Sequence, residues 1–446
     1  MRAAATRRGP PLPLHASVER FAQDRRTWYA GTVPRFEPFS GLRYDPSRVP
    51  LAQVVAPPYD VISPDEEAAL LAQSPYNSVR IEMPAAEDAD GGGDGDGADR
   101  YQAAATRIAR WRDEGVLRRD PAPSFYGYRM TYDDEAGHRR QTVGVVGALQ
   151  LEQPGAGGIF PHERTTPKAK SDRLQLLEAT RVNTSPIWAL SLAPGLSRAV
   201  HEPTGHTDPV VDSDGVRHEL WPVTDPTAIA TISRTVAAAP VVIADGHHRF
   251  ETALTYQAQR RQAAIDGGSH RDGPHGYDAV MTLVVELVED ELSVRAIHRL
   301  ISGLPEGVDL VPTWAPFFDF TPTDASDATI LKRMEQAGSL ALVTVDGAWL
   351  LHPKPATSAA AGHDLDSSRL EVALAALPHH DVVYQHGWDL AVGAVRRREA
   401  QAALLLNAVT IEQIAATGRG GERMPPKSTF FWPKPKTGFV FREVAD

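Results

Sequence analysis

One short segment combines a glycine with several side chains that can bind phosphate. Asp245-Gly246-His247-His248-Arg249 follows the apolar run 241–244 and precedes a helical pattern. A strand that turns through glycine into a helix leaves the first backbone N–H groups unpaired, and the helix dipole favours an anion there. Gly246 lets a ligand approach the backbone, and Arg249 offers a guanidinium suited to phosphate or carboxylate. The pattern predicts phosphate chemistry, although such turns are common and the histidines can be solvated cap residues.

A second segment, residues 158–173, concentrates the groups that phosphoryl transfer requires. Its lysines and arginines can neutralise a transferred group, its hydroxyls can orient that group, and a carboxylate can accept a proton. A charged, solvated loop that leads into a helix over 172–180 is the structural alternative. The candidate residues in this segment are His162, Glu163, Arg164, Thr165, Lys168, Lys170 and Arg173.

The third candidate segment lies at 424–434. Lys427-Ser428-Thr429 ends like a P-loop, but the glycine-rich element that must precede it is missing, so a P-loop is excluded. Phe430-Phe431-Trp432 predicts an apolar anchor that holds the tail against the body of the protein. Both roles are compatible, with Lys427 and Ser428 reaching the phosphate site.

Composition limits the class of protein. The chain has 446 residues, 42% of them hydrophobic, which suggests two or three domains or lobes. Its net charge of −11 argues against a general nucleic-acid binder. It has no cysteine and no stretch apolar enough to span a membrane, so we expect a cytoplasmic protein that binds a small molecule. The sequence sets no oligomeric state.

Hydrophobic periodicity gives the expected organisation. Strand pairs are predicted for 124–132 with 141–149, for 279–287 with 292–301, and for 340–345 with 349–352. Ser63 is expected to cap a helix that runs to about Gln73. We expect an α+β fold in which a mixed sheet with antiparallel hairpins is followed by a second α/β lobe. The expected units are a flexible extension at 1–34, a catalytic domain at 35–302 with an acidic Gly/Asp loop at 88–99, and a C-terminal lobe at 303–446 whose tail returns to the site.

Several motifs, in this order, resemble one bacterial family known as domain of unknown function 1015. The matching segments are 57–62, Asn77, 162–165, 170–173, 183–186, 244–249, 298–299 and 426–429. The turn at Gly246 also resembles that of free L-serine kinases and, more loosely, that of ParB-type partition proteins and sulfiredoxins. The resemblance implies a ParB/sulfiredoxin-like turn in which Gly246, His247, His248 and Arg249 hold phosphate. It places Asp245 near the metal or the acceptor hydroxyl.

These observations favour a phosphotransferase or phosphatase that acts on a small hydroxylated metabolite, with serine or phosphoserine as the leading substrate. Glu163 and Asp245 are the candidates to carry the hydroxyl proton, with His162 and His247 beside them as catalytic groups. Asn183 and Thr184 are expected to bind the amino-acid end. A divalent ion, if used, would be Mg²⁺ on the carboxylates, and a nucleotide or pyrophosphate would be the phosphoryl donor or acceptor.

Two other classes of function agree less well with the sequence than an enzyme of this kind. A nucleotide-binding regulatory module of the ParB type would need a basic DNA-reading element, and no basic helix-turn-helix is visible. A nuclease would need an electropositive groove and clustered metal-binding carboxylates, for which the sequence gives less support.

Overall fold

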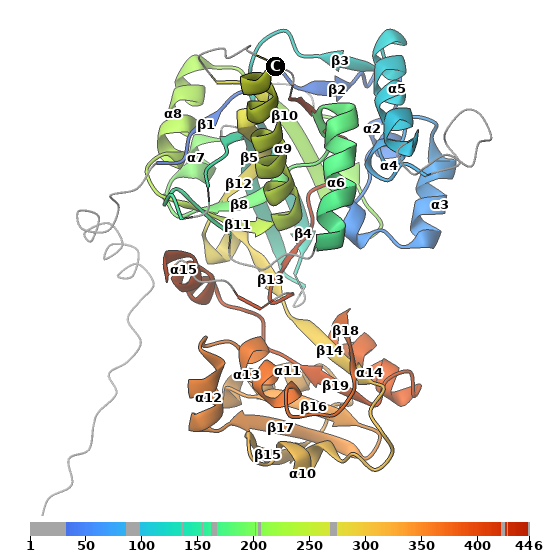
Figure 1. Cartoon of the computed structure of the whole chain (residues 1–446), viewed down its shortest axis with the longest axis vertical. Helices are drawn as coiled ribbons and strands as arrows, with labels where there is room; N and C mark the ends of the chain where they lie inside the picture. The colour runs from blue at the N-terminus through green and yellow to red at the C-terminus, as the bar shows by residue number, and fades with distance from the viewer. Residues whose placement is uncertain are drawn as a thin grey trace, which may run out of the picture.

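The protein consists of two lobes joined by a narrow connection (Figure 1). The structure is a computed structural model, and it describes residues 33–85, 99–134, 137–153, 155–161, 167–200, 202–203, 207–267, 274–420, 424–425 and 427–444. The extension expected at 1–34 and the loop expected at 88–99 fall almost entirely outside these ranges. Within them, no helix has the length and apolar character needed to cross a bilayer.

The first lobe is built on a nine-stranded mixed sheet in the order β6-β11-β8-β12-β5-β4-β10-β9, with β1 beside β5. The pairs β11–β6 and β12–β8 are parallel, and the other pairs are antiparallel. This confirms the expected mixed α+β fold. The strands are β1 (Phe36–Glu37), β4 (Phe125–Asp133), β5 (Arg139–Gln150), β6 (Ile159–Pro161), β8 (Ile187–Ser191), β9 (Val210–Val211), β10 (Arg217–Val223), β11 (Val241–Asp245) and β12 (Ala279–Glu286).

Helices cover one face and one edge of this sheet. In Figure 1, α6 (Pro167–Thr180) and α9 (His247–Asp266) lie side by side in front of it, and α5 (Asp99–Asp113) packs on α6. Ser63 accepts a hydrogen bond from Glu66 N at the start of α3, which confirms the predicted cap. The remaining elements of the lobe are β2 (Leu42–Tyr44), α2 (Leu51–Val54), η2 (Tyr59–Val61), α3 (Pro64–Gln73), α4 (Val79–Glu82), β3 (Leu117–Arg119), β7 (Val182–Asn183), α7 (Leu196–Ala199), α8 (Pro226–Val236), η4 (Gly276–Asp278) and η5 (Glu289–Glu291).

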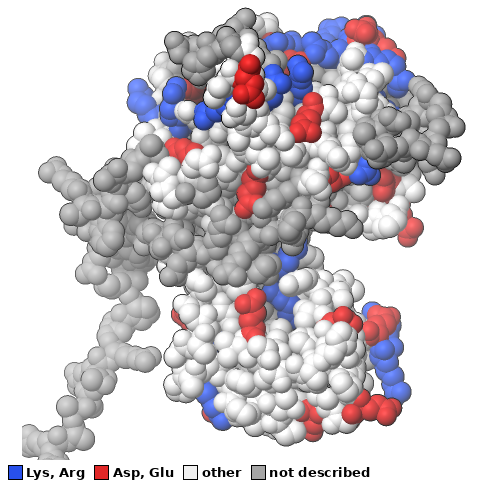
Figure 2. Space-filling model, in the orientation of Figure 1, with Lys and Arg blue, Asp and Glu red and all other residues white. Residues whose placement is uncertain are grey.

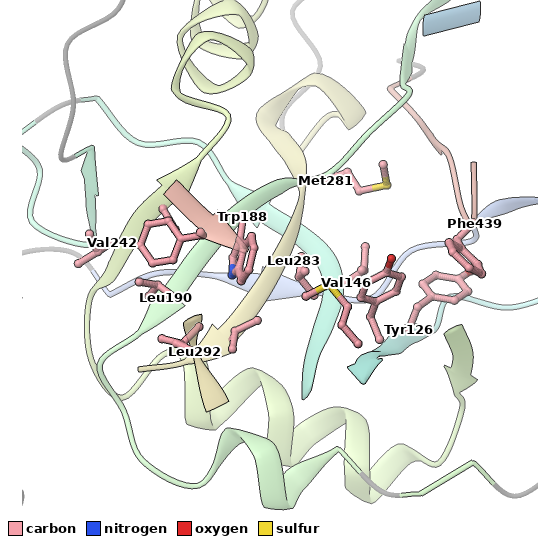
Figure 3. Packing of buried hydrophobic residues seen from close by; sticks show 14 of the residues in the cluster. Tyr126, Val146, Trp188, Leu190, Val242, Met281, Leu283, Leu292 and Phe439 are labelled. Atoms are coloured by element: carbon pink, nitrogen blue, oxygen red, sulfur yellow. The ribbon is translucent and has the colours of Figure 1, made fainter. Parts of the chain in front are cut away.

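Alternation along β11 divides the core between the two faces of the sheet. Val242 packs in one cluster with Trp188 and Met281, whereas Val241 packs in another with Phe250 of α9. Figure 3 shows the first of these clusters, in which Phe439 of the C-terminal tail also takes part. Because β11 is buried on both faces, the turn that follows it at Gly246 is held firmly in place.

The second lobe contains a six-stranded antiparallel sheet in the order β15-β17-β16-β19-β14-β18. The domain boundary expected between residues 302 and 303 falls at the end of β14, the first strand of this sheet. The strands are β14 (Ile297–Ser302), β15 (Phe318–Thr323), β16 (Leu340–Thr344), β17 (Gly347–Pro353), β18 (Asp381–His386) and β19 (Ala402–Leu405). The helices are α10 (Leu310–Trp314), α11 (Thr329–Ala337), α12 (Pro355–Ala361), α13 (Asp366–Leu374) and α14 (Trp388–Arg396). The helix that follows, α15 (Ile411–Gly420), packs against the first lobe, where Ile414 joins the cluster of Trp188.

Two of the three predicted strand pairs are confirmed, as β4 with β5 and β16 with β17. The third, 279–287 with 292–301, is wrong. There β12 pairs with β5 and β8 in the first lobe, while β14 pairs with β18 and β19 in the second. The acidic turn at 289–291 is the place where the chain leaves one sheet for the other, because each apolar run finds its partners far away in the sequence.

The C-terminal tail crosses back from the second lobe to the first. Its strand β20 (Phe430–Trp432) pairs with β13 (Ser293–Arg295), and β21 (Arg442–Glu443) pairs with β7. Backbone bridges also join Phe441 to Leu42 and Thr437 to Ala56. The apolar anchor predicted from Phe430-Phe431-Trp432 therefore lies between the lobes, with Phe431 in the core of the first lobe.

Candidate functional site

The turn between β11 and α9 has the geometry that the sequence predicts. Gly246 adopts a left-handed conformation with φ of 85° and precedes the first residue of α9. A Cβ atom there would lie 3.0 Å from Ile187 Cγ2, so both the conformation and the space favour glycine. The first turn of α9 carries no acidic residue. No acid therefore opposes an anion at the positive end of this helix dipole.

Asp245 lies between two cations. Arg249 Nη2 is 3.2 Å from its Oδ2, and Lys434 Nζ contacts its Oδ1. Burial would raise the pKa of Asp245, but Lys434 and Arg249 outweigh that effect and lower it from the usual 3.8 to about 2. Asp245 is thus ionised at neutral pH and holds both cations in place.

Arg249 connects this pair to a buried carboxylate. Its Nη1 donates to Ser185 Oγ at 2.9 Å and to the carbonyl oxygen of Pro186 at 2.7 Å. Ser185 Oγ in turn donates to Glu82 Oε1 at 2.9 Å. Together with the contact to Asp245, these bonds hold the guanidinium in place from two separate segments of the chain.

A second arginine, Arg173 of α6, lies on the other side of Glu82. Its Nη1 donates to the carbonyl oxygen of Glu82 at 2.8 Å, its Nε donates to Asp172 Oδ2 at 2.8 Å, and its guanidinium lies 4.3 Å from the ring centre of Tyr59. Burial would lower the pKa of Arg173, but Glu82 and Asp172 raise it above its ordinary value. Burial raises the pKa of Tyr59 to about 12, although Arg249 opposes this. Arg173 is therefore a permanent cation in the wall of the site.

A cavity of about 40 Å³ lies between the N-terminal part of α9, the helix α6 and the segment that joins β7 to β8. Both arginines line it. Its lining is formed by Glu82, Arg173, Leu176, Leu177, Val182, Asn183, Thr184, Ser185, Arg249, Thr252 and Val280. Four of the residues predicted from sequence, Arg173, Asn183, Thr184 and Arg249, thus meet around one space, and Asp245, Gly246, His247 and His248 adjoin it through the turn.

Not every predicted residue keeps the role expected for it. The side-chain oxygen Oδ1 of Asn183 accepts hydrogen bonds from Met281 N at 3.0 Å and from Arg442 Nη1 at 3.2 Å, so this oxygen ties β7 to its neighbours. Residues 162–166 lie outside the described ranges, and this segment includes the candidates His162, Glu163, Arg164 and Thr165. Lys168 and Lys170 are in the first turn of α6, but their side chains also lie outside what the structure describes.

The lysine that the tail brings to Asp245 is Lys434 and not Lys427. Ser428 Oγ contacts Ser367 Oγ at 3.0 Å, and the carbonyl oxygen of Lys427 accepts a hydrogen bond from Arg299 Nη2 at 2.9 Å. Both residues are therefore against the second lobe. The reason is the direction of β20, because Lys427 precedes this strand on the side of the second lobe and Lys434 follows it on the side of the first.

Basic side chains also gather where the lobes join. Figure 2 shows Lys and Arg side chains (blue) in the narrow connection. Burial together with Lys427, Lys434, Arg295 and Arg299 lowers the pKa of His386 to about 4. The positive potential of Arg249 and Lys434 beside Asp245 thus extends along the tail into the junction between the lobes.

Sequence reasoning missed Glu82, Ser185, Tyr59 and Lys434 as site residues. Ser185 and Tyr59 do belong to motifs that the sequence singled out, at 183–186 and 57–62, and Lys434 closes the third candidate segment. Glu82 carried no local signal, since α4 is one turn long and its burial results from packing against α5 and α6.

Among the described residues, no three His, Asp or Glu side chains gather closely enough to hold a metal ion. Both oxygens of Asp245 already contact cations. The described side chains around Asp245 therefore do not fit a magnesium site.

The structure is similar to several solved structures at low identity. A free serine kinase mutant in complex with ADP is 12% identical, with a TM-score of 0.36, and the match covers 65% of this chain and 89% of the kinase. A conserved hypothetical protein from Pyrococcus furiosus is 13% identical, with a TM-score of 0.34 and coverage of 65% and 92%. SbnI with a C-terminal truncation, from Staphylococcus aureus, is 12% identical, with a TM-score of 0.34 and coverage of 66% and 86%. Scores this low do not establish equivalent positions, so no residue role follows from them.

The curated proteins contain no significant match to this sequence. The family models do contain one, which is described as a protein of unknown function, DUF1015, and which matches residues 36–373. The matched region is more than half of the chain and includes the β11–α9 turn, both arginines of the cavity and Glu82. The chain belongs to the DUF1015 family.

Proposed function

We propose that this protein catalyses phosphoryl transfer on a small hydroxylated metabolite, as a kinase or as a phosphatase, with serine and phosphoserine as the leading substrates. The observation that carries the proposal is the meeting of Arg249 and Arg173 around one cavity, with Arg249 in the acid-free first turn of α9. Fixed cations and backbone N–H groups of this kind stabilise the charge on a transferred phosphoryl group.

In this proposal the phosphate lies at Gly246 and Arg249. The helix N-terminus and the guanidinium bind its oxygens, and Lys434 supplies further positive charge from the tail. Asp245 orients Arg249 and Lys434. A carboxyl group with a pKa of about 2 is a poor proton acceptor near neutral pH, so the proton transfer falls to other groups.

Glu163 and His162 are our candidates for that proton transfer. In the kinase direction, Glu163 takes the proton as the substrate hydroxyl oxygen attacks phosphorus and the bond to the donor breaks. In the phosphatase direction, water attacks phosphorus and loses a proton to Glu163, while His162 gives a proton to the departing serine oxygen. A nucleotide or pyrophosphate is the proposed donor in the first case, and no donor is needed in the second.

A turnover screen tests this function on the purified full chain. Phosphate release from O-phosphoserine and phosphoserine formation from serine with ATP, ADP or pyrophosphate would be measured. Arg249→Lys keeps one charge but loses the fork that meets Ser185 and Pro186, and we expect it to lower turnover roughly 100-fold. Arg261→Lys is the matched control, because Arg261 is on the same helix and pairs with Asp278 at 2.6 Å, away from the cavity.

The possible results separate the functional classes. Turnover that is lost in Arg249→Lys and kept in Arg261→Lys supports the enzyme. Nucleotide binding without turnover of any of these substrates would contradict it and would favour the regulatory module.

A further inference from the structure

Glu82 is a buried carboxylate in the wall of the cavity, and the proposed phosphate grip does not use it. Its side chain is 1% exposed. Oε1 accepts a hydrogen bond from Ser185 Oγ at 2.9 Å and is 3.6 Å from Arg173 Nη1. Oε2 is buried and has no hydrogen-bond partner among the described residues. Buried polar atoms are rarely left in this state, so this oxygen requires an explanation.

The neighbouring Arg173 donates no hydrogen bond to Glu82 Oε2. Arg173 directs its Nε and Nη2 to Asp172, at 2.8 and 2.5 Å, and its Nη1 to the carbonyl oxygen of Glu82. The hydroxyl of Thr252, which lines the same cavity, is likewise buried without a partner. The cavity therefore presents an anionic acceptor and a hydroxyl to whatever fills it.

The chemistry of these walls selects a small cationic donor. A space of about 40 Å³ holds about three water molecules, or an ammonium group with the carbon that carries it. Arg249 closes the cavity at the end nearest Gly246, where the proposed function places phosphate.

We propose that Glu82 Oε2 accepts a hydrogen bond from the ammonium group of the substrate and so selects amine-bearing compounds. The preferred class is β-hydroxy amino acids and their phosphate esters, in preference to hydroxy acids of the same size. This inference rests on the proposed phosphoryl transfer, whose phosphate grip at Arg249 sets the other end of the substrate. Glu82 thereby makes binding depend on the positive charge of the substrate's amino group.

Binding to the full chain tests this selection separately from turnover. Affinities would be measured for O-phosphoserine, for its N-acetyl derivative, which lacks the ammonium charge, and for phosphoglycerate, which has a hydroxyl in place of the ammonium. In the wild-type protein we expect O-phosphoserine to bind about 10- to 100-fold more tightly than either of the others. Glu82→Gln keeps the size and the acceptor for Ser185 but removes the charge, and it should abolish most of this preference while phosphoglycerate binds as before.

The outcomes distinguish the two proposals. Equal affinity or equal turnover for O-phosphoserine and phosphoglycerate in the wild-type protein would overturn the role of Glu82 and leave phosphoryl transfer standing. Failure to bind or turn over any phosphate ester would overturn both. If Glu82→Gln does not fold, the comparison of O-phosphoserine with phosphoglycerate on the wild-type protein still decides the question, because a hydroxyl replaces the ammonium group there with little change in size.

Discussion

Each lobe contains a strand that turns through a left-handed glycine into a helix, yet the two turns have different chemistry. Gly246, with φ of 85°, joins the buried strand β11 to α9, and Gly387, with φ of 81°, joins the exposed edge strand β18 to α14. The first turn of α9 contains no acid, and Arg249 folds back onto Asp245. The first turn of α14 contains Asp389, which already satisfies the helix dipole.

The difference shows what a strand–glycine–helix turn needs in order to bind an anion. Both glycines have a positive φ, although ψ is 27° at Gly246 and 120° at Gly387, so a glycine with positive φ does not by itself decide the chemistry. What decides it is the charge of the first helical turn and the presence of cations that other segments hold in place. Only the turn at Gly246 has both.

The largest expected effect comes from removing the cation that folds back. Arg249→Ala leaves Asp245 with Lys434 as its cation and removes three hydrogen bonds of a buried guanidinium, to Asp245, Ser185 and Pro186, so we expect the free energy of unfolding to fall by about 3–5 kcal/mol. Arg396→Ala, in the helix after the second turn, removes an exposed side chain that donates to the carbonyl oxygen of Ala325 at 3.3 Å and should cost under about 1 kcal/mol. Urea unfolding of both variants measures the contrast, and equal losses would show that the two turns are equivalent.

The next largest expected effect is on the pH dependence of stability, which should differ between His298 of the second lobe and Asp245 of the first. Burial, with Arg299 and His386, lowers the pKa of His298 from 6.5 to about 4, so its neutral form stabilises the fold fully above pH 6.5. That contribution is lost as pH falls from 6.5 to 4, at about 1.4 kcal/mol per pH unit. The lowered pKa of Asp245 stabilises the fold above pH 3.8, and this contribution disappears only as pH falls to about 2.

Unfolding free energies measured between pH 7 and pH 3 check this order. His298→Gln retains an acceptor for Leu406 N and should reduce the slope between pH 6.5 and pH 4, while the lowered pKa values of His386 and His218 maintain the remainder. A slope that persists unchanged in this variant would mean that another group titrates there.

A methyl group added at each glycine should have a smaller and unequal effect. Gly246→Ala and Gly387→Ala both force alanine into a left-handed conformation, which costs about 1–2 kcal/mol. At Gly246 the new Cβ would also crowd Ile187 Cγ2 and Arg249 Nη2, at 3.0 and 3.1 Å, whereas at Gly387 it would meet the movable carboxylate of Asp389. We therefore expect Gly246→Ala to lose more unfolding free energy than Gly387→Ala. We expect a loss of turnover in Gly246→Ala alone.

The smallest expected effect is at the acid of the second turn. Asp389→Asn removes a favourable charge from the N-terminus of α14 and should lower the unfolding free energy by about 0.3–1 kcal/mol. Calorimetric titration with inorganic phosphate should still detect no binding at this turn, because no arginine follows Gly387 as Arg249 follows Gly246. Binding there would show that an empty helix end is sufficient.

The sequence predicted the elements of the site better than their connections. The strand, glycine and helix at 241–266 were readable because each is signalled by neighbouring residues. The hairpin assigned to 279–301 was wrong because β12 and β14 have partners distant in sequence, which local periodicity does not encode. Lys427 was preferred to Lys434 for a similar reason, since the direction of β20 depends on its pairing with β13.

Glu82 shows a different limit of sequence reasoning. It belongs to no motif that the sequence analysis identified. Its importance comes from burial beside Ser185 and Arg173, which are about a hundred residues away in the chain. A carboxylate acquires this kind of role only when packing removes it from water, and burial depends on the whole fold.

Lys434 reaches Asp245 only because the chain returns from the second lobe to the first. During synthesis, Asp245 leaves the ribosome long before Lys434, and the entire second lobe is made in between. Until the tail is made, Asp245 in the nascent first lobe therefore has only Arg249, and not Lys434, as its cation. We conclude that the site is assembled after translation of the tail, so an unfinished copy of this protein cannot have a completed site.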